Sequence, residues 1–284
     1  MLDVLSVALR AVSFVLLFQA AGIALFVAAF ARPLASSDAS IRRLGRVAAL
    51  AALVVASGQY ALEPARMAGE LAGMFDASLQ KLAWSSSGMS AFVFRILGLA
   101  TVAVGLRRAP GWFARMSVLG AVLTIASFAL TGHTSTNTSR WLLAPLLLIH
   151  LIIVAFWFGA LWPLYLVSLR EPRATVVRII DAFSTAAIWL VPLILLAGSA
   201  MAVVLISDTA VLGRPYGELL ITKVVLFAAL MVFAGLNKWR FTPGIAAGEL
   251  RASSGFRRSV LAEYVLICGV LAVTAVMTTF FSPE

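Results

Sequence analysis

Eight long apolar runs, separated by short polar breaks, constrain this sequence more than any other feature. The runs cover residues of about 4–31, 44–62, 89–106, 113–132, 141–168, 183–206, 218–237 and 260–281. Each is close to the roughly 20 residues that a helix needs to cross the hydrocarbon core of a bilayer. Backbone groups in lipid must bond to one another, which favours helices. The runs predict an all-α polytopic membrane protein with about eight transmembrane helices.

The composition agrees with a membrane protein and leaves no room for a sizeable soluble domain. The 284 residues are 62% apolar and 12% charged, whereas soluble domains are about 45–50% apolar and about 25% charged. The net charge is +10, but the basic residues sit in the short breaks between runs, so they do not indicate nucleic-acid binding. We expect one membrane domain over 1–284, surrounded by the lipid bilayer, with no nucleic-acid partner.

The basic residues also predict an orientation. Alternate breaks with their flanks hold fifteen of them: Arg32, Arg42, Arg43, Arg46, Arg107, Arg108, Arg115, Arg170, Arg173, Arg178, Lys238, Arg240, Arg251, Arg257 and Arg258. The other breaks hold four: Arg66, Lys81, Arg140 and Arg214. Because basic loops remain in the cytoplasm, both termini are expected in the periplasm.

The chain has features of an internal duplication. Residues 85–108 resemble 213–240, and the first run can be laid on the fifth by aligning Gly22 with Gly159. This predicts two four-helix halves in parallel orientation, 1–132 and 133–284, and such repeats place sites at their interface. The alternative is chance likeness between two hydrophobic sequences.

Both histidines fall in or beside the fifth run. His133 is predicted at the outer membrane face, and His150 lies nine residues beyond Trp141, which is roughly 13 Å along a helix. An ionisable side chain at that depth indicates function. The alternative is a structural histidine bonded to a serine or a backbone carbonyl. Trp157, seven residues after His150, is expected on the same helix face.

Copper is the metal that these residue types favour, because imidazole and thioether groups both bind it. Five of the seven methionines beyond Met1 fall toward the predicted outer face: Met67, Met74, Met89, Met201 and Met277. Of these, Met67, Met74 and Met277 join His133 and His150 as candidate ligands. Methionine is also an ordinary core residue, and no MxxM spacing supports the set.

Charged residues inside the runs form a second group. Arg10, Arg95 and Lys223 each lie about six residues inside a run. They predict either an anion site, with Glu218 or Asp208 as counter-ions, or cations whose side chains reach the headgroups. Glu263 is expected near the inner end of the last run, either paired with Arg257 or Arg258 or serving as a proton or ion relay.

A family resemblance rests on the pattern GH, sixteen intervening residues and then H-x6-W-x-G-x-L-x-P, spanning Gly132 to Pro163. With the opening residues, "PYGELLITK", the "LNK" at 236–238 and the late Glu263, it resembles the CopD/PcoD copper-resistance family of bacterial inner-membrane proteins. The likeness spans nearly the whole chain, with a CopD-like core of about 141–281. Family members often have a histidine in the first span where this chain has Ser13.

The resemblance implies an eight-helix inner-membrane protein that moves copper from periplasm to cytoplasm or confers copper tolerance. It also implies a periplasmic copper-binding partner of the CopC type. One alternative is a membrane haem protein with His150 as axial ligand and arginines or Lys223 holding propionates. Another is a non-transporting partner that recruits a periplasmic protein through 63–88. No soluble-enzyme fingerprint occurs, so we expect no enzymatic activity.

Overall fold

The structure, a computed structural model, is built almost entirely of helices. It describes every residue except 1, 108–110, 133–136, 207–210, 212 and 282–284. The long helices are α1 (Leu2–Phe30), α2 (Asp38–Ala61), α5 (Ser87–Gly105), α6 (Trp112–Ala126, extended by the 3-10 helix η2, Ser127–Leu130), α8 (Arg140–Arg170), α9 (Arg173–Leu205), α10 (Pro215–Leu236) and α12 (Leu250–Phe280). Each predicted run therefore forms one long helix.

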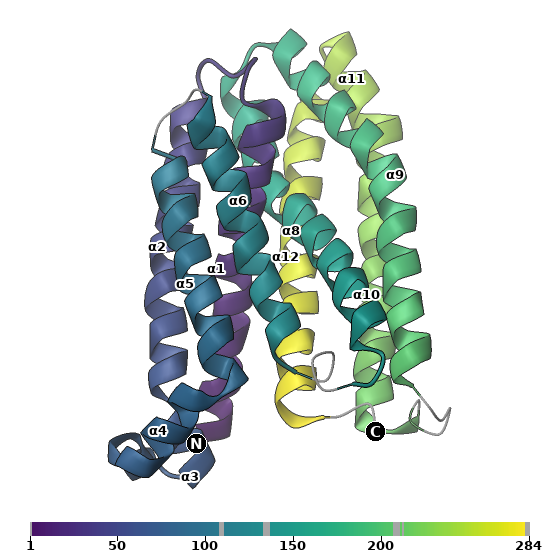
Figure 1. The fold of residues 1–284 in the computed structure, drawn as a ribbon. Coiled ribbons are helices and arrows are strands. Elements are labelled where there is room, and N and C mark those ends of the chain that lie inside the picture. Colours follow the sequence, from purple (N-terminus) through teal and green to yellow (C-terminus); the bar gives the residue numbers. More distant parts are fainter. Residues whose placement is uncertain (1, 108–110, 133–136, 207–210, 212, 282–284) are drawn as a thin grey trace.

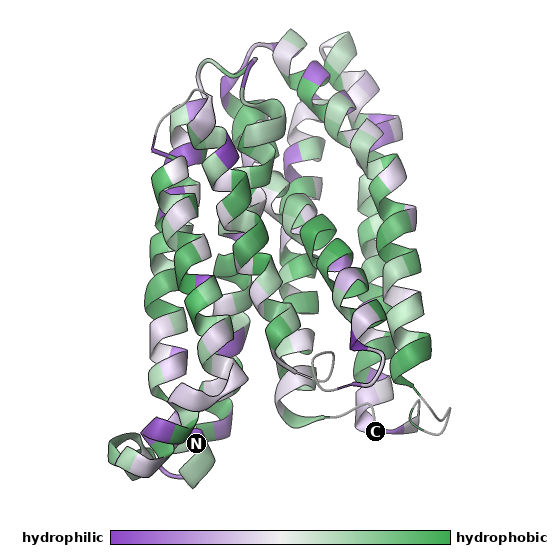
Figure 2. Ribbon diagram, viewed as in Figure 1, coloured by the Kyte–Doolittle hydropathy of each residue, from purple (hydrophilic) through white to green (hydrophobic). Residues whose placement is uncertain are grey.

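Seven of the helices in the described part of the chain are long and apolar enough to cross a membrane. The prediction of an all-α polytopic membrane protein is confirmed. The eighth, α2, is not among the seven. Its first turns carry Arg42, Arg43 and Arg46, and it stands beside α1 and α5 along their length (Figure 1). Most hydrophilic residues lie near the helix ends (Figure 2).

The long helices form two groups that stand side by side (Figure 1). The first contains α1, α2, α5 and α6, and the second contains α8, α9, α10 and α12. Arg10 near the start of α1 donates to the Thr278 carbonyl near the end of α12, at 2.7 Å. The start of α1 and the end of α12 therefore share one end of the bundle, which we call the terminal end. The opposite end, where α1, α5, α8 and α10 finish, is called the basic end, because it carries the described residues among the fifteen basic positions; Arg108 lies outside the described residues.

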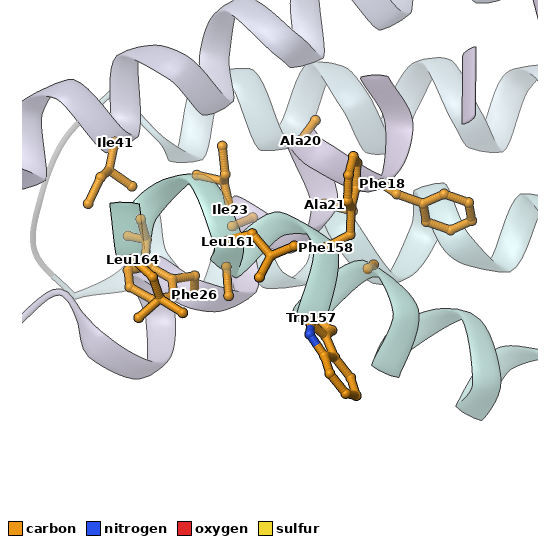
Figure 3. Packing of buried hydrophobic residues seen from close by; sticks show 14 of the residues in the cluster. Phe18, Ala20, Ala21, Ile23, Phe26, Ile41, Trp157, Phe158, Leu161 and Leu164 are labelled. Atoms are coloured by element: carbon orange, nitrogen blue, oxygen red, sulfur yellow. The ribbon is translucent and has the colours of Figure 1, made fainter. Parts of the chain in front are cut away.

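The two groups meet where α1 crosses α8. A β-carbon on Gly22 would lie 1.8 Å from the Ala155 carbonyl oxygen, and one on Gly159 would lie 2.3 Å from the Gly22 α-carbon. Only glycine at both positions lets the backbones approach this closely. Around the crossing, Phe158 and Leu161 of α8 pack with Ile23 and the other buried side chains of α1 (Figure 3). The residues aligned in the predicted duplication thus contact each other.

The segment expected as an outer loop, 63–88, is helical in the structure. It forms α3 (Glu63–Ala68), the 3-10 helix η1 (Leu71–Phe75) and α4 (Ala77–Ser85) at the terminal end, beneath the first group (Figure 1). Pro64 stands in the first turn of α3, where its missing N–H costs nothing. Asp76 caps α4 by accepting from the Ser78 and Leu79 N–H groups. Local capping signals therefore explain these short helices.

At the basic end, α10 continues into a π-helical segment, η4 (Asn237–Phe241), and then into α11 (Thr242–Ala247). A π turn inserts an extra residue into a helix and is frequent at functional sites. Gly248 closes α11 with a φ of 86°, a left-handed conformation that glycine adopts readily. The chain then reverses into α12.

Candidate functional site

His150 lies on α8, ten residues beyond Arg140 at the start of that helix. Its Nδ1 is 3.3 Å from the carbonyl oxygen of Ile194 on α9. A carbonyl only accepts, so Nδ1 carries the proton in this contact and Nε2 keeps its lone pair. This is the carbonyl partner expected of a structural histidine. It is also the arrangement that orients metal-binding imidazoles, because ligating histidines commonly donate their other ring N–H to a carbonyl.

A glycine and a lysine lie near the His150 ring. A β-carbon at Gly198, one turn beyond Ile194 on α9, would lie 3.5 Å from the ring carbon Cε1. Gly198 therefore leaves one flank of the ring uncovered. Lys223 of α10 is half-buried and close enough to act electrostatically on the ring. The site thus combines residues from three helices of the second group.

A buried polar cluster lies further along α8 toward the basic end. Trp157, on the helix face expected from its spacing, donates its indole N–H to Glu263 Oε2 at 3.3 Å. Asn237 Nδ2 donates to the other oxygen, Oε1. In Figure 3 the Trp157 indole points away from the α1 side chains. The carboxylate of Glu263, with its residue 2% exposed, is therefore held by two neutral N–H donors.

The partners predicted for Glu263 need correction. Glu263 was expected near the inner end of the run 260–281; α12 begins before that run, at Leu250, so Glu263 lies thirteen residues into the helix, at roughly 20 Å of helical rise. It was also expected to pair with Arg257 or Arg258. The salt bridges within the described residues join Arg42 to Asp38 and Arg66 to Glu63 instead.

A cavity of about 340 Å³ adjoins this cluster. It lies among α8, α9, α10 and α12, and Glu263, Asn237 and Trp157 contribute to its wall. Its lining is mostly apolar, from residues such as Phe183 and Val191, with the few polar groups gathered at one side. Such a combination is typical of a binding site.

The three cations inside the apolar runs, Arg10, Arg95 and Lys223, lie in two separate places. Arg95 donates from Nε to Ser127 Oγ at 3.2 Å and lies 4.8 Å from the centroid of the Phe128 ring. Arg10, bonded to Thr278, is close enough to Arg95 for their charges to interact. Lys223 lies instead near His150.

The counter-ions considered for these cations are not seen in the described part of the chain. Glu218 takes no part in the salt bridges found there, and Asp208 lies outside the described residues. Whether the cations hold an anion therefore stays a prediction.

The other candidate ligands are spread over the terminal end. Met67 belongs to α3 and is 42% exposed, and Met74 belongs to η1. Met277, near the end of α12, packs with Val211 and Tyr216 in a small buried cluster. His133 lies outside the described residues. No group of three His, Cys, Asp or Glu side chains gathers in the ranges that the structure describes. A shared ligand set for these residues stays a prediction.

Two features of the site were missed from the sequence. Asn237 was noticed only within "LNK" and had no assigned role, although a lone amide directly after an apolar run was a usable signal. The Ile194 carbonyl carries no sequence signal at all. Ser13, which takes the place of the first-span histidine, is 1% exposed, and its Oγ has no hydrogen-bond partner in the structure.

Two family models match the chain over separate ranges. The model described as copper resistance protein D matches residues 177–277. The model described as copper resistance protein D-like, N-terminal domain, matches residues 1–141. The chain belongs to the copper resistance protein D family. This confirms the family resemblance, although the motif from His150 to Pro163 lies between the two matched ranges. The chain is a membrane protein of a copper-resistance family.

A curated relative matches along nearly its full length. The chain is 25% identical over 286 residues to the inner membrane protein YebZ of Escherichia coli (strain K12), covering 96% of this chain and 97% of the relative. No solved structure matches the chain. The fold described above therefore comes from this structure alone.

Proposed function

We propose that this protein carries copper across the bacterial inner membrane, from the periplasm toward the cytoplasm, with His150 as a ligand on the path. The single observation that supports this most is the contact between His150 Nδ1 and the Ile194 carbonyl. It leaves Nε2 available in a chain whose family is named for copper resistance. The inner-membrane location rests on the relative, YebZ.

The direction rests on the distribution of charge. The breaks assigned to the basic end hold fifteen basic residues in the sequence, against four in the other breaks, and this bias favours a cytoplasmic location for the basic end. Copper would enter at the terminal end, where Met67, Met74 and Met277 offer thioether ligands and where the sequence predicts the imidazole of His133. His150 would be the next ligand on the path, and the cavity beside Glu263 lies beyond it toward the basic end.

A periplasmic copper-binding protein of the CopC type is the donor that we propose at the terminal end. The segment α3–α4 carries exposed apolar side chains there, with Phe75 86% and Trp84 68% exposed. A pull-down with purified donor should lose its signal when residues 63–85 are replaced by a short polar linker. Equal capture of the donor by the native chain and by the chain with the linker would show that the donor does not bind through this segment.

Copper is favoured over haem because of the space around His150. The cavity beside Glu263 and the pocket at the terminal end lined by Leu2 and Arg66 do not include His150 in their walls. A ferrous or ferric haem would need a large slot directly beside its axial ligand. We therefore expect no Soret band in the visible spectrum of the purified protein, and a strong Soret band would favour the haem alternative.

The proposal is tested by copper binding and uptake in purified protein. Wild-type protein in detergent should bind copper, and His150→Ala should weaken binding by at least about tenfold, the lower range for loss of a group that supports a metal site. In proteoliposomes the same variant should slow copper uptake. Gly58→Ala is a suitable control, because a β-carbon there meets no atom within 4 Å. Unchanged binding and uptake in His150→Ala would refute the role of His150.

A further inference from the structure

The cluster of Glu263, Trp157 and Asn237 has no role in the copper ligation proposed above. Glu263 lies within the second group of helices, and in the described structure its partners are the neutral donors Trp157 and Asn237 rather than a cation. A carboxylate that deep in a membrane protein is costly when ionised and unpaired, and such groups commonly carry protons. We propose that Glu263 is a proton-carrying residue that exchanges its proton with the basic end through the adjoining cavity.

The Asn237 amide can hydrogen-bond to this carboxyl group in both of its protonation states. It donates from Nδ2 to Glu263 Oε1, as an ionised carboxylate requires. Its Oδ1 is buried and has no hydrogen-bond partner in the structure. When Glu263 gains a proton it becomes an O–H donor. A half-turn of the Asn237 amide then presents Oδ1 to accept from it, so the orphan acceptor gains its missing partner.

The position of Asn237 explains how the amide reaches Glu263. It is the first residue of the π-helical segment η4, which interrupts the helix between α10 and α11. The Thr242 hydroxyl donates to the Asn237 carbonyl at 2.7 Å. That bond fixes the backbone at the π turn while the side-chain amide remains bonded only to Glu263.

The cavity supplies a route for the proton. Its volume of about 340 Å³ exceeds the roughly 30 Å³ that one water molecule occupies in the liquid, so several waters fit. Its wall runs from Glu263 and Asn237 to Trp239, which is 77% exposed. The cavity therefore joins the buried carboxyl group to the surface near the basic end. A proton passes from water in the cavity to a Glu263 carboxylate oxygen and returns the same way.

Few other charged groups face Glu263. In the cavity wall the one other titratable side chain is Lys238 of η4. The residues that α9 contributes to the wall are apolar except for Ser184. On α12 itself, the Tyr264 ring is turned onto Phe158, with centroids 4.7 Å apart.

The remaining helices that pack on α12 bring their charges elsewhere. Arg10 of α1 bonds at Thr278, fifteen residues and roughly 22 Å of rise from Glu263. Lys223 of α10 lies fourteen residues before Asn237, at roughly 21 Å. No residue of α11 is titratable. The described groups that act directly on the Glu263 carboxyl are thus the N–H donors of Trp157 and Asn237.

The coupling of this proton to copper rests on the proposed function. His150 and Trp157 are seven residues apart on α8, or roughly 10 Å along the helix, and Trp157 bonds directly to Glu263. A copper cation held at or beyond His150 disfavours a second positive charge nearby, so the proton on Glu263 leaves to the cavity. For the monovalent ion Cu(I), one positive charge enters the site as one proton departs, so the charge of the site is conserved.

Infrared spectroscopy of the copper-free protein tests the proton site itself. Wild-type protein at neutral pH should show a carboxylic-acid C=O band that titrates and that Glu263→Gln removes. Glu249→Gln is the matched control, because Glu249 is exposed and precedes α12. Asn237→Leu, which keeps Glu263 but removes both amide groups, should shift the band. If Glu263→Gln fails to fold, Asn237→Leu and Trp157→Phe still report on the band. Absence of any band that responds to these variants would overturn the proposal.

A pH-indicator measurement tests the coupling. Copper added to weakly buffered protein should release about one proton per copper in wild type and in Glu249→Gln, and none in Glu263→Gln. Equal release from Glu263→Gln would overturn the coupling. If wild-type protein binds no copper, the proposed function fails, whereas the infrared experiment still decides whether Glu263 holds a proton.

Discussion

The two four-helix groups differ most in how their helices pack. In the first group α5 and α6 meet through small residues. A β-carbon on Gly98 would lie 2.4 Å from Thr124 Oγ1, and one on Gly105 would lie 2.6 Å from the Ser117 nitrogen. In the second group the cavity beside Glu263 lies between α9 and α10, whereas the corresponding pair in the first group, α2 and α5, pack together.

The polar residues differ in part along the same division. In the first group the Thr124 hydroxyl bonds back to its own helix, at the Gly120 carbonyl, 2.8 Å away, although Gln19 donates across to the Gly159 carbonyl of α8 and the Ser13 hydroxyl has no partner. Buried polar groups of the second group bond between helices, as Trp157 and Asn237 do to Glu263. The first group is a closely packed support, and the second holds the groups that a ligand or proton can use.

The largest loss of stability is expected for a substitution at the crossing of α1 and α8, where the two groups meet. Gly159→Leu would force α1 and α8 apart, because the β-carbon alone would lie 2.3 Å from the Gly22 α-carbon and backbone atoms cannot move aside cheaply. We expect destabilisation above about 3 kcal/mol, beyond ordinary overpacking, with loss of monodisperse protein in detergent. Thermal unfolding against Gly58→Ala measures it. A stable Gly159→Leu protein would show that the two groups do not depend on this crossing.

Packing within each group predicts a smaller difference between two matched substitutions. Gly98→Ala in the first group should destabilise by about 1–3 kcal/mol, because its β-carbon would meet backbone atoms of α6. Gly269→Ala in α12 should be neutral or slightly stabilising, since its β-carbon would meet only Leu226 at 3.7 Å and alanine favours helix. Equal melting temperatures for the two variants would remove the distinction between a close-packed and an open group.

Ser13 tests whether a residue of the first group of helices affects copper binding. Its hydroxyl is buried without a partner, so Ser13→Ala should leave stability unchanged or raise it by up to about 1 kcal/mol. Copper binding should not change, because the site lies in the second group. Thermal unfolding and copper titration check both points, and weakened copper binding by this variant would make Ser13 part of the site.

The sequence was sufficient to predict the helices and their order, because each span is a continuous apolar run. It also aligned Gly22 with Gly159, which the structure brings into contact, and it singled out His150, Trp157 and Glu263. It could not predict how they connect. The bond between His150 and Ile194 joins residues 44 positions apart, and the place of Asn237 depends on a π turn that no propensity signals.

The smallest change in stability is expected for a substitution at Glu171, where the basic ends of the two groups meet. Burial alone raises the pKa of the Glu171 carboxyl, but hydrogen bonds from the Ser37 hydroxyl and from the Ser37, Ser36 and Ala35 N–H groups outweigh it and hold the pKa below its usual value. A lowered folded-state pKa contributes stability above the unfolded-state pKa, and that stability is lost as pH falls through the folded value.

Glu171→Gln should therefore cost at most about 0.5 kcal/mol at neutral pH, because solvent screens this exposed group. The difference from wild type should shrink on acidification. Melting curves at neutral and acidic pH test this, and a difference that grows as pH falls would contradict the sign.

The most direct test of the account is X-ray absorption at the copper edge of protein loaded with one copper ion. The account predicts nitrogen coordination from imidazole in wild type and in Ser13→Ala, and loss of that nitrogen contribution in His150→Ala. An identical spectrum for wild type and His150→Ala would contradict the claim that the second group of helices holds copper through the Nε2 atom of His150.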